Sequence, residues 1–426
     1  MIKQAFKRLW NDKRGNALVI AGAAMPMVIG SAGLATDTIQ WVNWKRHLQR
    51  AADSAAIAGV YAKMQSQAPA SAVATDLVTN NKTGVALLST YPQLAFPADT
   101  TNYTNAVRVT LAIKQSLSFS SMFISTSPTI TAAATAGIIQ TGDYCVVSLE
   151  SSATTGITAT GSTDINLGCG MITNSTSLNA AVAAGSSSVA ASPIAAVGGI
   201  QSSNNWATGT QLLPFTVAQS DPFGSIEATA PTTCVPGGNL TIGPSATLDL
   251  SAMTTAPCYN NLTVKGTLKL PPGPIYINGG DVGANSGALI DGTLGSTIVL
   301  TNIDTSPTAT IGTMDLNGGA TVKMVAPTSG NFKGIAIYQD RRAVDDGTTS
   351  ASSPNKINGN SSSKYEGGIY FPKQQITFNG NAGINTNCMQ LVVRRVYFSG
   401  NSAINNVCPV GSGASSFKGQ HVRLVD

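Results

Sequence analysis

Six cysteines are the residues of this chain whose type and spacing could form covalent links or hold a metal ion. They fall into three pairs with separations of 24, 24 and 20 residues: Cys145 and Cys169, Cys234 and Cys258, and Cys388 and Cys408. No Cys-x-x-Cys occurs, and the two histidines lie far apart in the sequence, which disfavours a zinc site. We therefore expect three disulfides, each closing a loop that stabilises the fold by roughly 3 kcal/mol, and neither a metal nor another cofactor.

The densest group of charged side chains is the second candidate for chemistry. It comprises Asp340, Arg341, Arg342, Asp345 and Asp346, and Glu366 follows one repeat later. Paired carboxylates could act as general acid and base on a glycosidic bond, and carboxylates beside an arginine could form a calcium-assisted lyase site. The Asn-Thr-Asp run and Gly-His-Gly motif of polygalacturonases are absent. We expect a solvated loop whose charges pair among themselves, and no catalytic residue.

Aromatic side chains near the carboxy terminus could bind sugar rings on a flat β surface. The set is Tyr365, Tyr370, Phe371, Tyr397 and Phe398. Inward-facing positions of a repetitive β structure would place most of them in the core instead, and we favour that interpretation.

These candidate residues belong to a repetitive region that the sequence places at 141–426. Alternating apolar runs are interrupted by glycines at intervals such as 23, 21 and 20 residues, as in LTVKGTLKL at 262–270; the glycines are Gly161, Gly243, Gly266, Gly318, Gly359, Gly380 and Gly400. Repeats of this length are typical of solenoids, and Gly and Asn permit tight corners between short strands. We predict a right-handed parallel β-helix. A β-sandwich array is the alternative, and residues 175–221, which lack the pattern, would be an irregular set of repeats or a loop.

Composition agrees with a stacked structure. Only 11% of the 426 residues are charged, against an average of about 25%, while 42% are hydrophobic. Stacked repeats would set like charges against each other, so neutral Ser, Thr and Asn suit the outward positions. The net charge of +5 argues against nucleic acid as a partner, because +4 of it comes from the first 15 residues.

The basic segment 1–15 precedes a charge-free stretch at 16–36 that is long enough to cross a bilayer as a helix. The positive-inside rule places residues 1–15 in the cytoplasm and the bulk of the chain across the membrane. Two alternatives involve cleavage: a signal peptide ending near Ala35, or a prepilin leader ending at Gly15, although such leaders are normally followed by a glutamate where this chain has Ile20. We favour a retained single-pass anchor.

Beyond the membrane segment, apolar residues at three- and four-residue intervals predict a helical extension over 37–64. Its alanine-rich face would pack either on the chain's own downstream domain or on a partner subunit in the membrane. Residues 65–140 read as a small α+β module, with a helix at 70–88 and paired strands at 106–113 and 129–139.

The amino-terminal residues carry a family resemblance. RGNA at 14–17, GLATD at 33–37 and LQRAADSAA at 48–56 resemble the signature of TadE/TadG-like Flp (Tad) pilus-assembly proteins. Segments at 326–330, 334–341, 368–372 and 388–392 are similar to the β-rich carboxy-terminal regions of long TadG-like members. The Asp-x-Ser-x-Ser motif of the von Willebrand A domain found in other members is absent.

The resemblance implies an inner-membrane protein with one anchor, a large periplasmic part and pilus-assembly proteins as partners. We expect it to act mechanically, as a docking or spacer scaffold, and not as an enzyme. A β-helix adhesin that binds glycans, or a polysaccharide-cleaving enzyme, is the alternative.

Overall fold

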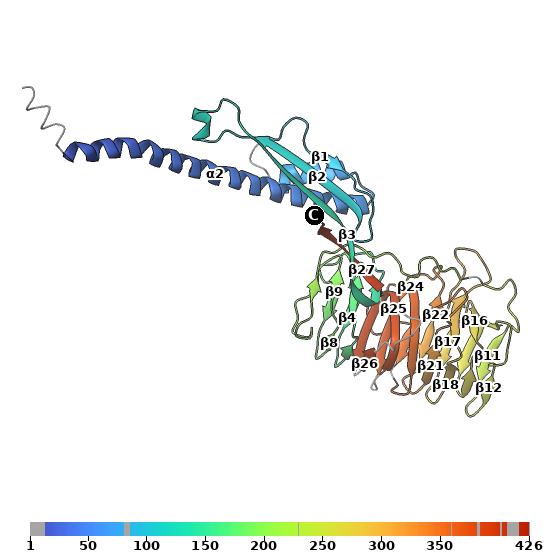
Figure 1. Ribbon diagram of the computed structural model, residues 1–426. Coiled ribbons are helices and arrows are strands. Elements are labelled where there is room, and N and C mark those ends of the chain that lie inside the picture. Colours follow the sequence, from blue (N-terminus) through green and yellow to red (C-terminus); the bar gives the residue numbers. More distant parts are fainter. Residues whose placement is uncertain are drawn as a thin grey trace, which may run out of the picture. The chain divides into compact units, whose positions relative to one another are not determined.

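A computed structural model describes residues 13–80, 86–228, 230–358, 360–380, 384–400, 403–406 and 417–425 (Figure 1). The chain divides into two compact units, Met1–Ile139 with Val422–Asp426, and Gln140–His421. The described elements are mostly β-strands, preceded by one long apolar helix. The prediction of a mainly β chain with an amino-terminal apolar helix is thereby confirmed.

The predicted anchor and its extension form one continuous helix, α2, which spans Lys13–Met64 (52 residues). The helical spacing of apolar residues beyond residue 36 follows directly on the charge-free stretch, so one helix continues through both segments without a break. Among the side chains described, the amino-terminal half exposes Met27, Val28 and Leu34, whereas the carboxy-terminal half buries Leu48 and Val60.

The helix predicted at 70–88 is shorter than expected. The structure has α3 at Pro69–Thr75, followed by one π-helical turn, η1, at Asp76–Asn80. Residues 86–88 are not helical, and the Leu88 amide donates to the Ala112 carbonyl at 2.9 Å. The Leu88 amide therefore has a partner in a strand and not in a helix, so the apolar periodicity up to residue 88 did not correspond to a helix at its end.

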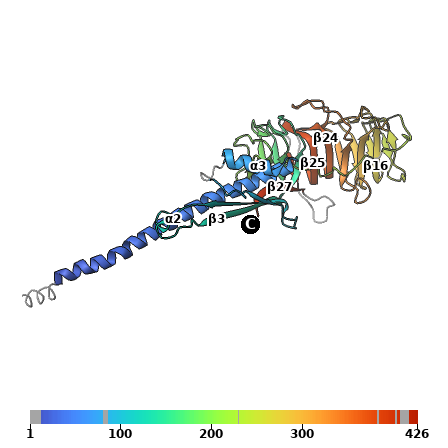
Figure 2. The same cartoon turned by 90° about the horizontal axis from the view of Figure 1, so that it is seen from above.

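An antiparallel sheet completes the first unit. Its strands are β1 (Gln93–Ala95), β2 (Thr104–Lys114) and the first part of β3 (Thr129–Ser148), with β2 in the middle. The strands predicted at 106–113 and 129–139 are confirmed, and they pair. Figure 2 shows β3 running beside α2. The loop between β2 and β3 contains a short 3-10 helix, η2, at Ser120–Met122.

The second unit consists of three ladders of parallel strands. We name them A, B and C and give each in spatial order. Ladder A contains β10 (Leu212–Leu213), β9 (Ile194–Ala196), β6 (Gly170–Thr173), the end of β3, β25 (Ile384–Gly400), β24 (Lys364–Gly380), β22 (Ile335–Gln339), β19 (Ser296–Thr301), β16 (Gly273–Asn278) and β13 (Cys258–Tyr259).

Ladders B and C have the same order. Ladder B contains β7 (Ala181–Ala183), β4 (Ile157–Ala159), parts of β25 and β24, β23 (Lys356–Asn358), β20 (Met314–Leu316), β17 (Val282–Ala284), β14 (Asn261–Val264) and β11 (Asn239–Ile242). Ladder C contains β8 (Ser188–Ala190), β5 (Asp164–Asn166), β26 (Ala403–Asn406), parts of β25 and β24, β21 (Thr321–Val325), β18 (Leu289–Gly292), β15 (Thr267–Lys269) and β12 (Thr247–Asp249).

The order of strands within the ladders differs from their order in the sequence. The last repeats, β25 and β26, pair on one side with β24 and on the other with the first strands, β3, β4 and β5. Figure 1 shows these red strands between the green early strands and the orange ones. Strand pairs described in this unit are parallel, which disagrees with the antiparallel hairpins of a β-sandwich array.

Residues 175–221, which lack the glycine pattern, continue the ladders through β7, β8, β9 and β10. Their small side chains suffice, because Ala181, Val189 and Ile194 are fully buried between repeats. This segment therefore contributes strands to the ladders, and the alternative that all of it is a loop is wrong.

One core runs inside the ladders. Alternate residues of each strand are buried there, as with Leu262 and Val264 in β14 and Leu268 in β15. A second apolar layer covers the outer face of ladder A, where residues 219–228, which we call the strap, lie over the strands. The strap contains Phe223 and Ile226, which pack on this layer.

Candidate functional site

The uncovered part of α2 is the first candidate for a functional surface. In the part of the chain that the structure describes, one helix, Ile20–Met64, is long and apolar enough to cross a membrane. Exposed apolar side chains line its amino-terminal half; they are Ile20, Met25, Met27, Val28, Ile29 and Leu34. Large apolar groups left in water cost free energy, so this segment requires an apolar environment.

The alanine-rich face of α2 packs on the chain's own module. Ala52, Ala55 and Ala56 are fully buried against apolar residues of β2 and β3. A methyl group placed on Gly59 would lie 2.9 Å from the Val107 side chain, so the helix and the sheet are in close contact. Of the two partners that the sequence allowed for this face, the structure shows the downstream domain.

The charged residues near 340 divide among separate networks. Asp340 is buried and accepts hydrogen bonds from the Thr301 hydroxyl and the Arg342 guanidinium, both at 2.8 Å. Burial alone would raise the pKa of Asp340, but the hydrogen bonds from Arg342 and Thr301 outweigh it and lower that pKa. Asp346 accepts from the Thr348 amide, and Glu366 pairs with Lys364 at 3.4 Å.

Arg341 ties the strap to ladder A. Its Nε donates to the Tyr370 hydroxyl at 2.7 Å, and that hydroxyl donates to Asp221 of the strap at 2.6 Å. Arg341 also pairs with Glu227 at 3.2 Å. Burial raises the pKa of Tyr370, so the hydroxyl keeps the proton that it donates to Asp221. Arg341 therefore fixes the strap and is not placed as a ligand for a substrate.

Asp345 belongs to a buried network that the sequence did not reveal. Arg395, which is 3% exposed, forms ion pairs with Asp345 and with the fully buried Glu150, and Arg394 pairs with Glu150 at 2.9 Å. Burial acts to raise the pKa of Glu150, but hydrogen bonds from Ser152, Arg395 and Arg394 lower it to about 2. The one signal in the sequence is the pair of arginines inside the apolar strand LVVRRVYF.

The prediction that these charges pair among themselves holds for Asp340 and Arg342 alone, because the other members pair with residues outside the cluster and Asp340 is buried instead of solvated. Asp340 pairs with Arg342, and Asp345 pairs with Arg394 and with Arg395, which it shares with Glu150. A carboxylate held in a charge-assisted pair is a poor proton donor near neutral pH.

The aromatic candidates lie mainly in the core. Tyr365, Tyr370, Phe371 and Phe398 are at most 1% exposed, and Tyr397 is partly exposed. The Phe398 ring stacks on Phe378 of the neighbouring repeat, with centroids 5.4 Å apart. Four of the five rings are therefore inaccessible to a glycan.

Two of the expected cysteine pairs are disulfides in the structure, Cys145–Cys169 and Cys234–Cys258. Each links neighbouring repeats, with Cα atoms 5.8 and 4.8 Å apart. The Cys388 side chain and Cys408 lie outside the described residues, so the third pair stays a prediction. Within the described ranges, His, Cys, Asp and Glu form no group that could hold a metal ion.

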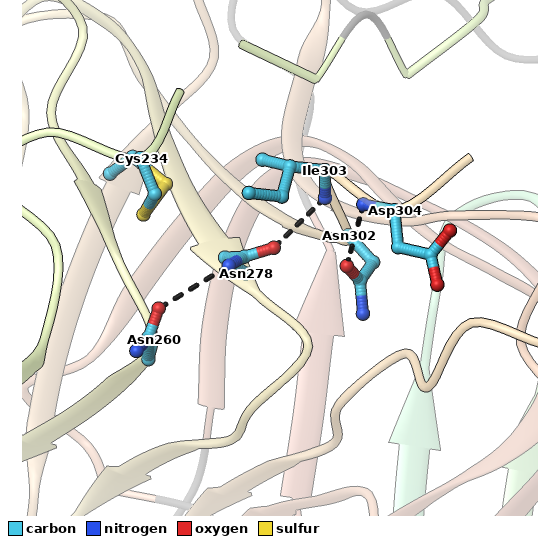
Figure 3. The surroundings of a disulfide bond; sticks show 7 residues. Cys234, Asn260, Asn278, Asn302, Ile303 and Asp304 are labelled. Atoms are coloured by element: carbon cyan, nitrogen blue, oxygen red, sulfur yellow. Dashed lines mark hydrogen bonds between the residues drawn. A yellow bond between two sulfur atoms is a disulfide. The ribbon is translucent and has the colours of Figure 1, made fainter. Parts of the chain in front are cut away.

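Asparagines stack near the Cys234–Cys258 disulfide (Figure 3). The Asn278 amide donates to Asn260 of the preceding repeat at 3.3 Å, and its oxygen accepts from the Ile303 amide at 2.8 Å. The Asn302 side chain accepts from the Asp304 amide at 2.9 Å. The two hydrogen bonds from the Ile303 and Asp304 amides give these backbone groups a neutral acceptor at a corner between repeats.

Comparisons with known proteins give one match. Residues 15–68 match the model of the Tad family, described as Flp pilus-assembly TadE/G-like. The matched residues lie almost wholly within α2, and they include its apolar segment and its alanine-rich face. No curated protein and no solved structure matches the chain.

Proposed function

We propose, from the TadE/G-like Flp pilus-assembly segment that the chain carries at residues 15–68, that it is a membrane-anchored assembly protein of the Flp pilus. Residues 16–36 cross the inner membrane once, residues 1–15 lie in the cytoplasm and the remainder lies in the periplasm. Its partners are the membrane and other pilus-assembly proteins.

The observation that carries the proposal is the division of α2 into two halves. One half has an uncovered apolar surface, and the other half is buried in the chain's own sheet. A continuous helix shared in this way couples a membrane segment rigidly to the folded domain. A flexible linker would be the usual choice for a simple tether.

Charge and cysteine usage support the orientation. Five basic residues precede the apolar segment, and such an excess normally stays in the cytoplasm: Lys3, Lys7, Arg8, Lys13 and Arg14. The disulfides lie on the other side of the segment, and disulfides persist in an oxidising space such as the bacterial periplasm.

Residues 37–64 would extend the anchor, 65–140 would form the membrane-proximal module and 141–426 a right-handed parallel β-helix. The parallel ladders, the separation of about 20 residues between paired strands and the inner core support this fold. Its role would be that of a docking or spacer scaffold, with rigidity supplied by the disulfides and the strap. The buried aromatic rings and paired carboxylates favour this role over glycan binding or cleavage.

Complementation in a strain that makes Flp pili tests the proposal. The wild-type gene should restore filaments and surface attachment to a deletion strain. A variant in which a cleavable signal sequence replaces residues 1–36 should reach the periplasm, form its disulfides and fail to restore filaments. If the deletion strain assembles filaments normally, or if the released domain restores them, the anchored-assembly proposal is wrong.

A further inference from the structure

The tip of the β2–β3 hairpin, residues 115–128, carries a group of exposed apolar side chains. Its sequence, QSLSFSSMFISTSP, contains no charged residue. Three consecutive side chains are largely exposed: Met122 at 76%, Phe123 at 74% and Ile124 at 56%. Three adjacent large apolar groups at a loop tip are more than the scattered exposure normal for a surface, and they need a partner.

The tip is held against α2 at the end of the charge-free stretch. Asp37 of the helix, which is 3% exposed, accepts hydrogen bonds from the backbone amide of Phe119 at 2.8 Å and from that of Ser120. Gln40 donates to the Ser118 hydroxyl at 2.9 Å. These bonds fix the tip beside the helix and leave Met122, Phe123 and Ile124 outside the contact.

Gly33 makes the close approach possible. A methyl group on this residue would lie 2.3 Å from the Phe119 ring, so a larger side chain could not be accommodated without moving the tip. Gly22 and Gly30, on the same helix, have no atom within 4 Å of such a group. The glycine of the GLATD segment therefore serves contact with the hairpin.

The position of this contact identifies the partner. The tip meets α2 beside the exposed Leu34, and the exposed Ile39 and Trp41 follow within two turns. Tryptophan is enriched at the level of lipid head groups. The opposite end of the same sheet lies near Lys63, whose ammonium is 5.6 Å from the Phe96 ring. Gly33 and Lys63 are separated by roughly 45 Å along the helix, so one bilayer surface cannot reach both.

We propose that residues 119–124 insert into the leaflet of the bilayer on the side from which α2 emerges, as a second membrane contact beside the helix. The apolar side chains enter the boundary between head groups and acyl chains. The Asp37 carboxylate stays at that boundary, where it accepts hydrogen bonds from the hairpin backbone. This inference rests on the proposed membrane anchoring. Its consequence is that α2 cannot tilt or rotate freely about its point of exit, because the hairpin gives the sheet of the first unit a second contact with the bilayer.

Lipid quenching of a fluorophore tests the insertion in the full-length chain. The chain is reconstituted in vesicles of phosphatidylcholine and phosphatidylglycerol that contain doxyl-labelled lipid. An NBD group is attached at Phe123→Cys, with Val28→Cys as the label within the membrane segment and Phe96→Cys as the matched exposed aromatic. The wild-type chain, taken through the same labelling, sets the background from its own cysteines.

We expect lipid with the doxyl group near the head group to quench the label at 123, and lipid with the doxyl group deep in the acyl chain to quench the label at 28. Neither lipid should change the label at 96. If the label at 28 is quenched but the label at 123 responds only to aqueous iodide, the inference is wrong, and the tip faces solvent or awaits a protein partner. If the label at 28 is not quenched either, the anchoring proposal itself fails.

A pair of glycine substitutions separates insertion from mere proximity. Gly33→Leu should displace Phe119 and reduce quenching at position 123, while the label at 28 remains quenched. Gly30→Leu is the matched control and should change neither signal, because its surroundings are open. Equal quenching at 123 in both variants would show that the contact with α2 does not position the tip, contrary to the proposal.

Discussion

A single buried carboxylate joins repeats that are remote in the sequence. Glu150 follows β3, and its partner Arg395 lies 245 residues later in β25. The two strands are neighbours in ladder A, where the Leu149 amide donates to the Val393 carbonyl at 2.7 Å. A buried ion pair adds little net stability, but it leaves an unpaired buried charge when one partner is removed.

Substitution of Glu150 should therefore be costly. We expect Glu150→Gln to lower the free energy of unfolding of the second unit by about 3 kcal/mol, because Arg395 loses one of its two carboxylates in a buried site. Denaturant unfolding of the full chain followed by the β signal in circular dichroism measures it. Glu227→Gln, whose side chain is 82% exposed in its pair with Arg341, is the matched control and should change little. If Glu150→Gln and Glu227→Gln lower the free energy of unfolding equally, the expected difference between the buried and the exposed carboxylate is wrong.

The same residue makes stability depend on pH. The pKa of Glu150 is about 2 in the folded chain against 4.5 ordinarily, so its contribution is complete above 4.5 and is lost as the pH falls toward 2. The pKa of Asp345 is also lowered, because hydrogen bonds from Arg395 and the Gly347 amide outweigh its burial, and it adds to this loss. We expect Glu150→Gln to flatten the acid limb of a stability–pH profile. An unchanged profile would exclude Glu150 as its source.

At the scale of elements, glycines form one corner of the ladders. Gly400, Gly161 and Gly185 stack in successive repeats with φ of +74°, +74° and +69°. A methyl group on Gly161 would lie 3.1 Å from backbone atoms of Gly400, and one on Gly185 would lie 3.1 Å from Gly161. The corner therefore needs glycine for two reasons, the left-handed backbone and the spacing between repeats.

Gly161→Ala should lower the stability of the second unit by about 2 kcal/mol, because alanine is strained at this φ and would contact the next repeat. Thermal unfolding compares it with Gly283→Ala. Gly283 lies in β17 with no atom within 4 Å of an added methyl group, so that substitution should be neutral or slightly stabilising. A neutral Gly161→Ala would show that the corner can relax.

The strap depends on fixed ends. Asn174 and Gln219 exchange hydrogen bonds of 2.8 and 2.7 Å where it begins, and Cys234 is bonded to Cys258 just beyond it. Between these points the Tyr338 hydroxyl donates to the Ile226 carbonyl at 3.0 Å. A segment crossing several repeats is held by a few contacts, so release of one end should free it locally.

Removal of the Cys234–Cys258 disulfide tests whether a fixed end keeps the strap in place. Cys234→Ser with Cys258→Ser should increase amide hydrogen exchange over residues 219–228 and lower stability by about 3 kcal/mol, the usual contribution of a loop of this length. Cys145→Ser with Cys169→Ser opens an equal separation of 24 residues elsewhere and should leave exchange in the strap unchanged. Increased exchange in both double variants would contradict a local role.

At the scale of the whole second unit, the last repeats complete the ladders that the first repeats begin. Strands β3, β4 and β5 have their neighbours in β25 and β26, which are synthesised more than 200 residues later. Contacts of such sequence separation form slowly, because the chain entropy between them must first be lost. The early repeats therefore stay incompletely paired until the chain is finished.

Truncation after Gly380 should expose this dependence. Without β25 and β26, we expect residues 143–213 to become sensitive to protease, while residues 235–358, which stack on one another, stay resistant. Limited proteolysis with mass spectrometry measures both regions in one sample. Equal resistance of the two regions would show that the early repeats are stable without the closing ones.

Local patterns in the sequence predicted much of this architecture because they reflect local physics. The charge-free run at 16–36 and the helical spacing to residue 64 predicted α2, since helical periodicity needs only neighbouring residues. Alternation at 106–113 identified β2, and the β-branched and alanine-rich run at 129–139 identified the first part of β3. The equal spacing of Cys145 with Cys169 and of Cys234 with Cys258 anticipated two disulfides, because one repeat separates each pair.

Other features depend on residues that no local pattern connects. The order of strands in the ladders brings Glu150, Arg395 and Asp345 into contact, and no local pattern in the sequence predicts it. The helix expected to reach residue 88 ended early, because Leu88 found a strand partner in Ala112. Residues 175–221 formed strands without the glycine signal, because neighbouring repeats supply the template for pairing.

The sequence by itself determined the long apolar helix, the strands of the antiparallel sheet and the repetitive character of residues 141–426, since composition and period are properties of the chain. Only the tertiary structure decided that the last repeats pair with the first, that the strap covers ladder A and that the hairpin tip meets α2 at Gly33. Each of these rests on contacts between residues far apart in the sequence, and such contacts are selected by shape and charge in three dimensions.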